Sequence, residues 1–151
     1  MIKGVMIKPL RVIPDERGRL MEILRGDESF FTKFGQVYIT TAHPGVVKGW
    51  HYHKVQEDNM AVVKGMMKIV LYDSRKDSPT FRKVNEFFLG VHSPYLLKIP
   101  PGILHGFKCI SKDEAVVVNI PSKAYNRDNP DEFRVHPHKN SIPYDWKRKD
   151  G

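Results

Sequence analysis

The sequence has a single cysteine, Cys109, among its 151 residues, and it lacks an apolar run of about 18 residues, the least that a transmembrane helix needs. One cysteine cannot form an internal disulfide, so the chain is not a disulfide-stabilised secreted scaffold and fits a reducing compartment. The N-terminal segment also lacks the apolar core of a signal peptide. We therefore expect a cytoplasmic protein without a membrane partner.

The sequence also lacks a concentrated basic patch. Lys and Arg number 25 against 17 Asp and Glu, a formal net charge of +8 that favours anionic partners. The basic residues are scattered, and the densest group is Lys147 to Lys149. Nucleic-acid-binding proteins gather such residues in a stripe with interleaved aromatics, so we expect no nucleic-acid partner.

Helical periodicity is nearly absent. Short apolar segments separated by turn residues are typical of an all-β sandwich or barrel. The one helical pattern is at Asp27 to Phe34, which predicts a short helix. Gly65 predicts a hairpin turn, and Pro100-Pro101-Gly102 predicts a sharp corner. The expected strands are residues 7–13, 19–24, 35–41, 46–53, 59–64, 66–73, 81–89, 95–99, 104–110 and 114–120.

The length fits one domain, residues 1–151, with a core at about 7–120. From residue 121 onward, repeated prolines among Asn, Asp and Arg predict an extended C-terminal tail on the domain.

Histidines carry the first motif that points to chemistry. His51 and His53 are two residues apart, so on a strand both face the same side. The patterns His51-x-His53-x-x-x-Glu57, followed by Gly65, and Pro100-x-Gly102-x-x-His105 resemble the two short motifs of the cupin superfamily. The resemblance implies a jelly roll, the cupin double-stranded β-helix, with these residues facing its interior.

One hypothesis for these residues is a metal centre. His51, His53, Glu57 and His105 could bind a divalent transition metal such as Fe, Mn, Ni or Zn, because imidazole and carboxylate suit these ions. A second hypothesis is that the histidines form a polar lining without metal. In a metal site, Asp58 next to Glu57 could crowd the negative charge or orient one of the metal ligands.

A more detailed resemblance covers about residues 11–120. The sequence resembles the dTDP-4-dehydrorhamnose 3,5-epimerase family in five ordered blocks: Asp15 to Glu22, Gln36, Gly45 to Tyr52, Asp73 to Phe81, and Ile99 to Phe107. The resemblance implies a homodimeric cupin that uses no metal or other cofactor. It also implies an isomerase or epimerase acting on a nucleotide-diphosphate 4-keto-6-deoxy sugar, in surface-polysaccharide or deoxysugar synthesis such as that of dTDP-rhamnose.

The family resemblance assigns a role to individual residues. His51 matches the base that removes the proton beside the ketone, and a neutral imidazole suits that task. His105 matches a second pocket histidine that contacts the sugar. The expected substrate-binding residues are Arg17 at the phosphates, Lys48 in place of the usual Arg, and Glu22 and Gln36 at the nucleotide, together with His53 and Asn119.

Three further positions depart from the family pattern. Asp58 stands where the family has a Lys that stabilises the enolate, and Asn119 replaces the proton-donating Tyr. Tyr125 is our candidate donor, with Tyr38 and Tyr52 after it. His53 replaces the usual Gln, giving the His-x-His of related sugar 3,4-ketoisomerases. The C-terminal Asp that pairs with the base histidine in the family has no clear counterpart here, and both His138 and Asp145 lie near its position.

These departures leave several functions open. A double epimerase, a single epimerase and a 3,4-ketoisomerase all form an enolate of a 4-keto sugar and differ in where the proton returns. Two further classes of protein also fit the residues, namely a metal-dependent cupin enzyme and a sugar-nucleotide binding protein without catalysis.

Overall fold

The computed structural model describes residues 1–150, and this part of the chain contains strands and turns without a helix. The all-β fold class is therefore confirmed. No helix in this range is long and apolar enough to cross a membrane. The strands are β1 (Met6–Pro9), β2 (Val12–Asp15), β3 (Gly18–Met21), β4 (Tyr38–Ala42), β5 (Val47–Tyr52), β6 (Asp58–Lys64), β7 (Met66–Asp73), β8 (Val84–Gly90), β9 (Tyr95–Ile99), β10 (Ile103–Cys109), β11 (Ala115–Asn119) and β12 (Phe133–Arg134).

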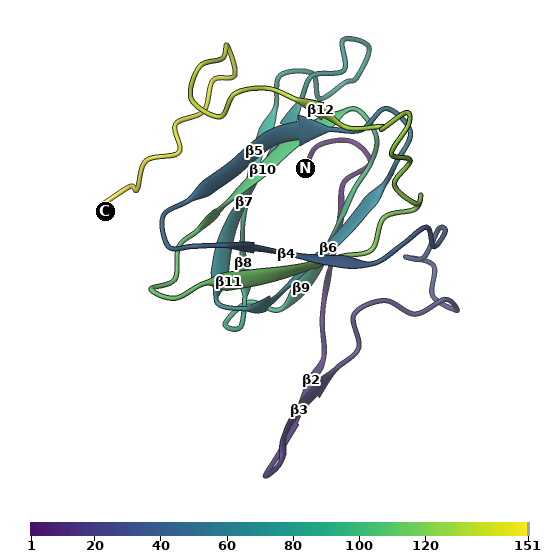
Figure 1. The fold of residues 1–151 in the computed structure, drawn as a ribbon, viewed down its shortest axis with the longest axis vertical. Helices are drawn as coiled ribbons and strands as arrows, with labels where there is room; N and C mark the ends of the chain where they lie inside the picture. The colour runs from purple at the N-terminus through teal and green to yellow at the C-terminus, as the bar shows by residue number, and fades with distance from the viewer. Residues whose placement is uncertain (151) are drawn as a thin grey trace.

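Two five-stranded sheets face each other and enclose the core (Figure 1). One sheet has the order β1-β9-β6-β11-β4 and the other β12-β5-β10-β7-β8, and neighbouring strands are antiparallel. In β11 buried and half-buried residues alternate, as expected for a strand with one face on the core. The space between the sheets is filled by apolar side chains such as Met60, Val62, Ile69 and Phe107. This is the jelly roll that the sequence predicts.

The chain passes between the sheets at Gly65. This residue separates β6 from β7, but β6 pairs with β9 and β11 in one sheet, whereas β7 pairs with β8 and β10 in the other. Gly65 has φ +69°, and a Cβ there would lie 2.8 Å from the Cβ of Ala115, so glycine suits the position. The predicted hairpin turn is therefore wrong. Residues 100–102 make the predicted corner between β9 and β10.

The predicted helix at residues 27–34 is also wrong, because these residues form turns and irregular chain. Of the three phenylalanines in this segment, Phe30, Phe31 and Phe34, only Phe30 is buried. It packs with Leu10, Ala61 and Leu96 on the outer face of a sheet. Phe34 is 58% exposed. A segment this short cannot offset the cost of starting a helix without a continuous buried face.

Two segments extend beyond the sheets. The β2–β3 hairpin projects from the body of the molecule (Figure 1) and pairs only with itself among residues 1–150. The tail runs along β5, adds β12 to it and packs Trp146 against Trp50, with ring centroids 5.0 Å apart. Trp146 covers the outer face of the sheet whose inner face carries the histidines.

Candidate active site

Polar side chains from the two sheets meet in the interior of the jelly roll. His51 on β5 and His105 on β10 come from one sheet, and His53 lies just after β5. Asp58 on β6 and Asn119 on β11 come from the opposite sheet. Three of these five residues, His105, Asp58 and Asn119, are at most 2% exposed. The interior therefore changes at this place from an apolar core to a buried polar cluster.

The two central histidines are direct partners across paired strands. His51 on β5 lies opposite His105 on β10, and their ring centroids are 4.0 Å apart. Glycines make this approach possible, because a Cβ at Gly49 would lie 2.8 Å from the Cα of Gly106. A side chain at either glycine would separate the strands and with them the two imidazoles.

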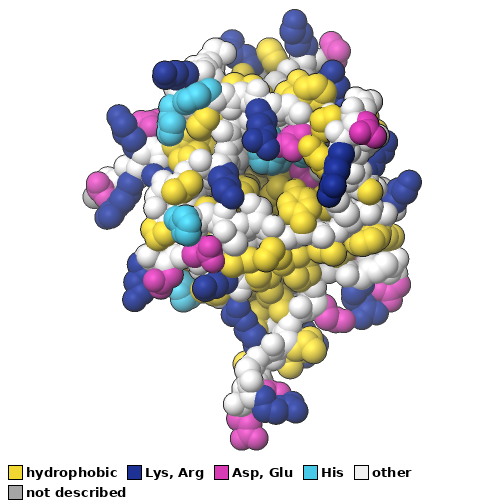
Figure 2. All heavy atoms as spheres, viewed as in Figure 1, with side chains coloured by type: hydrophobic (Ala, Val, Ile, Leu, Met, Phe, Trp, Pro, Cys, Tyr) yellow, Lys and Arg dark blue, Asp and Glu magenta, His cyan; other side chains and the backbone are white. Residues whose placement is uncertain are grey.

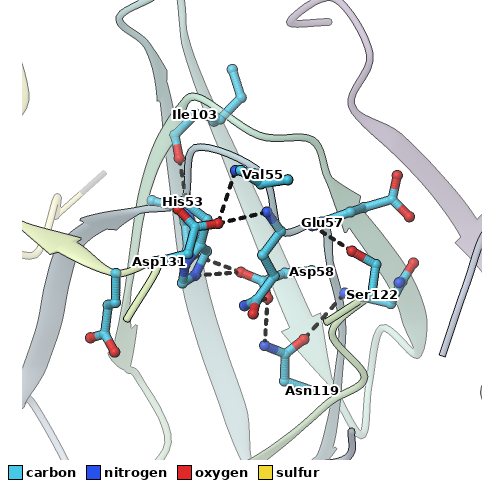
Figure 3. Close-up of polar contacts among 12 residues, drawn as sticks. His53, Val55, Glu57, Asp58, Ile103, Asn119, Ser122 and Asp131 are labelled. Carbon is cyan, nitrogen blue, oxygen red and sulfur yellow. Dashed lines mark hydrogen bonds and ion pairs between the residues drawn. The ribbon is translucent and has the colours of Figure 1, made fainter. Parts of the chain in front are cut away.

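His53 and Asp58 form the second part of the cluster (Figure 3). Nδ1 of His53 is in hydrogen-bond contact with the main-chain oxygen of Asp131. Nε2 of His53 lies 3.2 Å from Oδ2 of Asp58, and Nε2 of His105 lies 3.2 Å from the same oxygen. One carboxylate oxygen is thus in contact with two imidazoles.

The other oxygen of Asp58 is held by two amides. Asn119 Nδ2 and Gln56 Nε2 each donate a hydrogen bond of 2.9 Å to Oδ1. Asn119 Nδ2 also donates to the hydroxyl of Tyr38 at 2.8 Å. Asp131 fixes the loop before β6, because its carboxylate accepts the main-chain N–H groups of residues 54–56. The orientation of Asp58 is therefore set from several sides.

The environment shifts the pKa values of these groups in different directions. Burial, reinforced by neighbouring His105, lowers the pKa of His51 well below its usual range, so this imidazole is neutral at pH 7. Burial opposes ionisation of Asp58, but contacts with His105 and His53 outweigh it and hold the pKa of that carboxyl far below normal. Burial also lowers the pKa of His53, but the contact with Asp58 outweighs it and raises the pKa overall.

The cluster opens into a cavity of about 1530 Å³. His51, His53 and Tyr38 line it, whereas His105 is not among its lining residues. Figure 2 shows this hollowed face, with histidine and acidic side chains inside and Lys and Arg side chains around it. The basic residues that line the cavity are Lys33, Lys48, Lys54, Lys123 and Arg134. A buried polar floor and a basic rim suit a ligand with an anionic part that stays near solvent.

The comparisons with known proteins bear on this cavity. The sequence matches the model of the family described as dTDP-4-dehydrorhamnose 3,5-epimerase over residues 1–151. The chain belongs to this family. It is 36% identical over 146 residues to the spore coat polysaccharide biosynthesis protein SpsL of Bacillus subtilis, covering 97% of both chains.

Solved structures agree with the family assignment. The fold is similar to that of a dTDP sugar isomerase from Desulfovibrio desulfuricans G20, with a TM-score of 0.93, 31% identity, and coverage of 99% of this chain and 94% of the other. It is also similar to ChmJ, a 3'-monoepimerase from Streptomyces bikiniensis in complex with dTDP-quinovose. There the TM-score is 0.80 and the identity 26%, with 90% and 71% of the chains covered.

The structure brings together some of the residues that resemblance to the epimerase family selects. Gln36, Lys48, His51, His53 and Tyr125 all line the cavity. His105 and Asn119 lie in the buried cluster behind it. The five lining residues can therefore share one ligand, whereas His105 and Asn119, which do not line the cavity, contact only the residues around them in this structure.

Other expected residues lie elsewhere. Arg17 is at the tip of the projecting hairpin, where it pairs with Asp15, and Glu22 pairs with Arg25. Neither lines the cavity of its own chain. Tyr52 stacks on Phe133, with ring centroids 5.1 Å apart, in the cluster on the outer face of the sheet.

Glu57 is not close to the histidines. Its side chain points away from His53 (Figure 3), and Oε1 lies 3.3 Å from Nζ of Lys98. Among residues 1–150, the group of side chains able to share a metal ion contains His51, His53 and His105, whose ligand atoms lie within 4.8 Å of one another. The expected metal ligand Glu57 is thus corrected: Asp58, not Glu57, is the carboxylate next to the imidazoles.

Sequence reasoning missed Gln56 and Asp131, which hold Asp58 and the loop before it. Asp131 lies 75 residues after Gln56, whose main-chain N–H it accepts, and its segment contains no motif. No local pattern therefore signals its contact with the loop before β6. Gln56 could have been found only from the strand register, which brings it beside the buried carboxylate.

Proposed function

We propose that this protein is an epimerase or isomerase of a nucleotide-diphosphate 4-keto-6-deoxy sugar, with His51 as the base. The observation that carries this proposal is the position of His51, an imidazole that lines the cavity opposite His105 in a chain of this family. Proton abstraction next to a ketone needs a base that is unprotonated at neutral pH. His51 meets that requirement because burial opposes its protonation.

The reaction begins when His51 takes the proton from the carbon beside the ketone. The electrons of the broken C–H bond form a C=C bond, and those of the C=O bond move onto oxygen to give an enolate. Return of a proton to the opposite face inverts the carbon. A ketoisomer forms instead when the enolate oxygen takes a proton, the hydroxyl on the deprotonated carbon loses one so that its oxygen becomes the new C=O, and a proton is added to the former ketone carbon.

Tyr38 is better placed than Tyr125 to return the proton. Its hydroxyl lies 2.8 Å from Nδ2 of Asn119, the residue that replaces the donor tyrosine of the family. Tyr38 stands on the sheet opposite His51, so the two can act on opposite faces of a bound sugar. Burial and the nearby Asp58 charge raise the pKa of Tyr38, which keeps the phenol protonated. Tyr125 is 51% exposed at the cavity.

The basic rim supports a nucleotide diphosphate as the anionic part of the ligand. Lys48 on β5 and Arg134 on β12 line the cavity from the sheet that also carries His51. Arg134 is paired with Glu132, whereas Lys48 has no acidic partner among residues 1–150 and is available for a phosphate. Among residues 1–150, Lys48 makes a hydrogen bond of 3.3 Å to Thr40 and no ion pair. The positive charge of the lysines that line the cavity attracts phosphate groups more strongly than a neutral sugar.

A homodimer would explain the positions of Arg17 and Glu22. The β2–β3 hairpin exposes 45% of Ile13 and 57% of Leu20, apolar area that a second subunit could cover. Docked on another copy, the hairpin could deliver Arg17 to the phosphates in that copy's cavity. The setting we propose is cytoplasmic synthesis of a surface polysaccharide or other deoxysugar product.

The decisive experiment follows deuterium from solvent into the sugar. The protein is incubated with dTDP-4-keto-6-deoxyglucose in deuterated water, and C3 and C5 are examined by NMR and mass spectrometry. Deuterium at C3, C5 or both would support enolate formation and distinguish single from double epimerisation, and a 3-keto product would identify a ketoisomerase. His51→Asn should abolish incorporation, whereas His43→Asn, at an exposed position, should not.

The proposal fails if intact protein binds the nucleotide sugar without any exchange. That result would identify a sugar-nucleotide binding protein. An active His51→Asn variant would instead remove His51 from the role of base.

A further inference from the structure

A lysine is buried on the outer face of the sheet β1-β9-β6-β11-β4. Lys98 on β9 is only 5% exposed. Its neighbours Leu97 and Ile99 face the core between the sheets, so Lys98 faces the other way. On that outer face Leu96 packs with Phe30. A buried ammonium group is costly unless its hydrogens find partners, so the partners of Lys98 show what this residue holds.

Three groups surround the ammonium of Lys98. Nζ donates a hydrogen bond of 2.7 Å to the hydroxyl of Thr32 and lies 3.3 Å from Oε1 of Glu57. It also lies 5.1 Å from the centre of the Phe30 ring, which is within the range of a cation–π interaction. An ammonium carries three hydrogens, so hydroxyl, carboxylate and ring together can satisfy it. Lys98 thus joins the segment before β4 to the loop before β6.

Glu57 extends this connection to a third segment. Its main-chain N–H donates a hydrogen bond of 2.9 Å to Oγ of Ser122 (Figure 3), and the N–H of Ser122 donates one of 2.9 Å to the carbonyl of Glu57. The third segment also meets the first, because the N–H of Gly35 donates a hydrogen bond of 2.9 Å to the carbonyl of Pro121. A Cβ at Gly35 would lie 2.1 Å from the main-chain carbonyl carbon of Lys123, so these two segments are in direct contact.

The three connected segments line the cavity. Residues 33–36, 54–56 and 122–126 are all among its lining residues, and we call them the lysine-bearing wall. They carry three of the five Lys and Arg residues that line the cavity, namely Lys33, Lys54 and Lys123. Thr32 and Ser122 directly precede two of these lysines in the sequence. The contacts of Lys98 therefore act next to the side chains that give the cavity rim its charge.

Like charges oppose the assembly of the lysine-bearing wall. Within residues 1–150, neither Lys33 nor Lys123 forms an ion pair. Two like charges on touching segments repel each other. Lys98 opposes this repulsion, because it fixes Thr32 on one segment and Glu57 on the next. A wall that is held in place before the ligand arrives avoids the entropy cost of ordering it on binding.

We propose that Lys98 is a positioning residue for the ligand. By binding Thr32 and Glu57 it fixes the lysine-bearing wall, against which the anionic part of a nucleotide-diphosphate sugar binds. The identity of this ligand rests on the proposed function, whereas the connection through Lys98 rests on the contacts alone. Lys98 is on the outer face of the sheet, so it affects the binding of the ligand and not the removal of a proton by His51.

The test compares ligand affinity with reaction rate in full-length variants. Lys98→Met removes the charge but keeps the length of the side chain, and Thr32→Val removes the hydroxyl but keeps the shape. Calorimetry should show dTDP binding weakened about tenfold in Lys98→Met and about threefold in Thr32→Val. In the deuterium-exchange assay KM should rise by similar factors while kcat changes less than about twofold, which indicates lost binding and not lost chemistry. Amide hydrogen exchange should become faster at Gly35 and Ser122, whose N–H groups join the segments.

Lys8→Met is the matched control. Lys8 also lies over the Phe30 ring, but it pairs with Glu28, and neither Lys8 nor Glu28 lines the cavity. This variant should bind dTDP like wild type. Circular dichroism checks that each variant is folded, and Thr32→Val keeps the test valid if Lys98→Met does not fold. Unchanged dTDP affinity in the folded variants would overturn the proposal, and so would a loss of kcat at unchanged KM.

The two measurements separate this inference from the proposed function. Weaker dTDP binding by the variants, with no deuterium exchange into the sugar by wild type, supports the positioning role and contradicts the epimerase proposal. Normal exchange by wild type, with the same KM in Lys98→Met and Thr32→Val, overturns the positioning role and leaves the epimerase proposal intact. Wild type that does not bind dTDP overturns the positioning role together with the nucleotide part of the proposed function.

Discussion

The side-chain amide of Asn119 donates a hydrogen bond of 2.9 Å to Oδ1 of Asp58, from one strand to its neighbour in the same sheet. These residues stand where the family resemblance expects a tyrosine and a lysine. Because they contact each other, the two departures from the family pattern are coupled in the structure. An amide at 119 stabilises a carboxylate at 58, which a lysine at that position would not need.

This contact should produce energetic coupling between the two residues. We expect the double variant Asp58→Ala/Asn119→Ala to be more stable than the sum of the single effects predicts, with a coupling of about 1 to 3 kcal/mol. The reason is that either single change already removes the hydrogen bond. Urea denaturation measures the four free energies of unfolding. Asn119→Ala combined with Glu22→Ala, at an exposed position, should be additive, and additivity at 58 and 119 would contradict the link.

The sequence predicted the histidine cluster, but the metal hypothesis placed Glu57 beside it where the structure has Asp58. His51, His53 and His105 could be grouped because residues two apart share a strand face and the two motifs fall on paired strands. Choosing between Glu57 and Asp58 depends on where β6 begins. The strand starts at Asp58, which faces the interior, while Glu57 before it points to Lys98. A shift of one residue reverses the face, and sequence alone does not fix it.

Long-range contacts limited the other predictions in the same way. Turn residues correctly marked most strand boundaries because glycine and proline act locally. Gly65 was misread as a hairpin because its positive φ fits a turn, whereas its neighbours pair with strands far away in sequence. Asp131 joins the site from the tail for reasons visible only in the folded chain.

Asp73 should make stability depend on acid pH. This carboxylate is buried and accepts hydrogen bonds from Arg75, Ser78 and Thr80. Ser78 and Thr80, which belong to the Asp73 to Phe81 block of the family resemblance, therefore have a structural role in this loop. Burial opposes ionisation, but these donors outweigh it and lower the pKa of Asp73. Its contribution is therefore complete above the unfolded pKa of about 3.9 and declines as the pH falls towards the folded pKa.

Asp73→Asn should cost about 3 to 5 kcal/mol at pH 7, because Arg75 loses its charged partner. The difference from wild type should shrink as the pH falls below about 4, because the unfolded wild-type chain takes up a proton at Asp73 there, whereas the folded protein keeps the charge down to its lower pKa. Chemical denaturation at a series of pH values measures both effects. Asp77→Asn, in the same loop but exposed, is the control and should match wild type. A pH-independent difference would contradict this account.

Gly106→Ala should disrupt the site through the backbone. A Cβ there would lie 2.9 Å from the Cα of Gly49, 3.0 Å from the carbonyl of Lys48 and 3.2 Å from Cζ2 of Trp146. Relief of these contacts separates β5 from β10 and moves His51 away from His105. We expect a loss of stability of about 1 to 3 kcal/mol and a larger loss of exchange activity. Gly26→Ala, where a Cβ would meet nothing within 4 Å, should leave both unchanged.

The last prediction separates proton removal from proton return. If Tyr38 is the donor, Tyr38→Phe should reduce the inverted product about 100-fold or more, while His51 still exchanges the substrate proton for deuterium with retention of configuration. NMR of the recovered sugar distinguishes retention from inversion at the labelled carbon. Tyr125→Phe is the comparison, since Tyr125 also lines the cavity but is half exposed. Loss of inversion in Tyr125→Phe with normal product from Tyr38→Phe would exchange the roles of the two tyrosines. Equal loss of exchange and inversion in Tyr38→Phe would instead indicate that this hydroxyl orients the sugar or Asn119, because a donor needed only for proton return leaves proton removal intact.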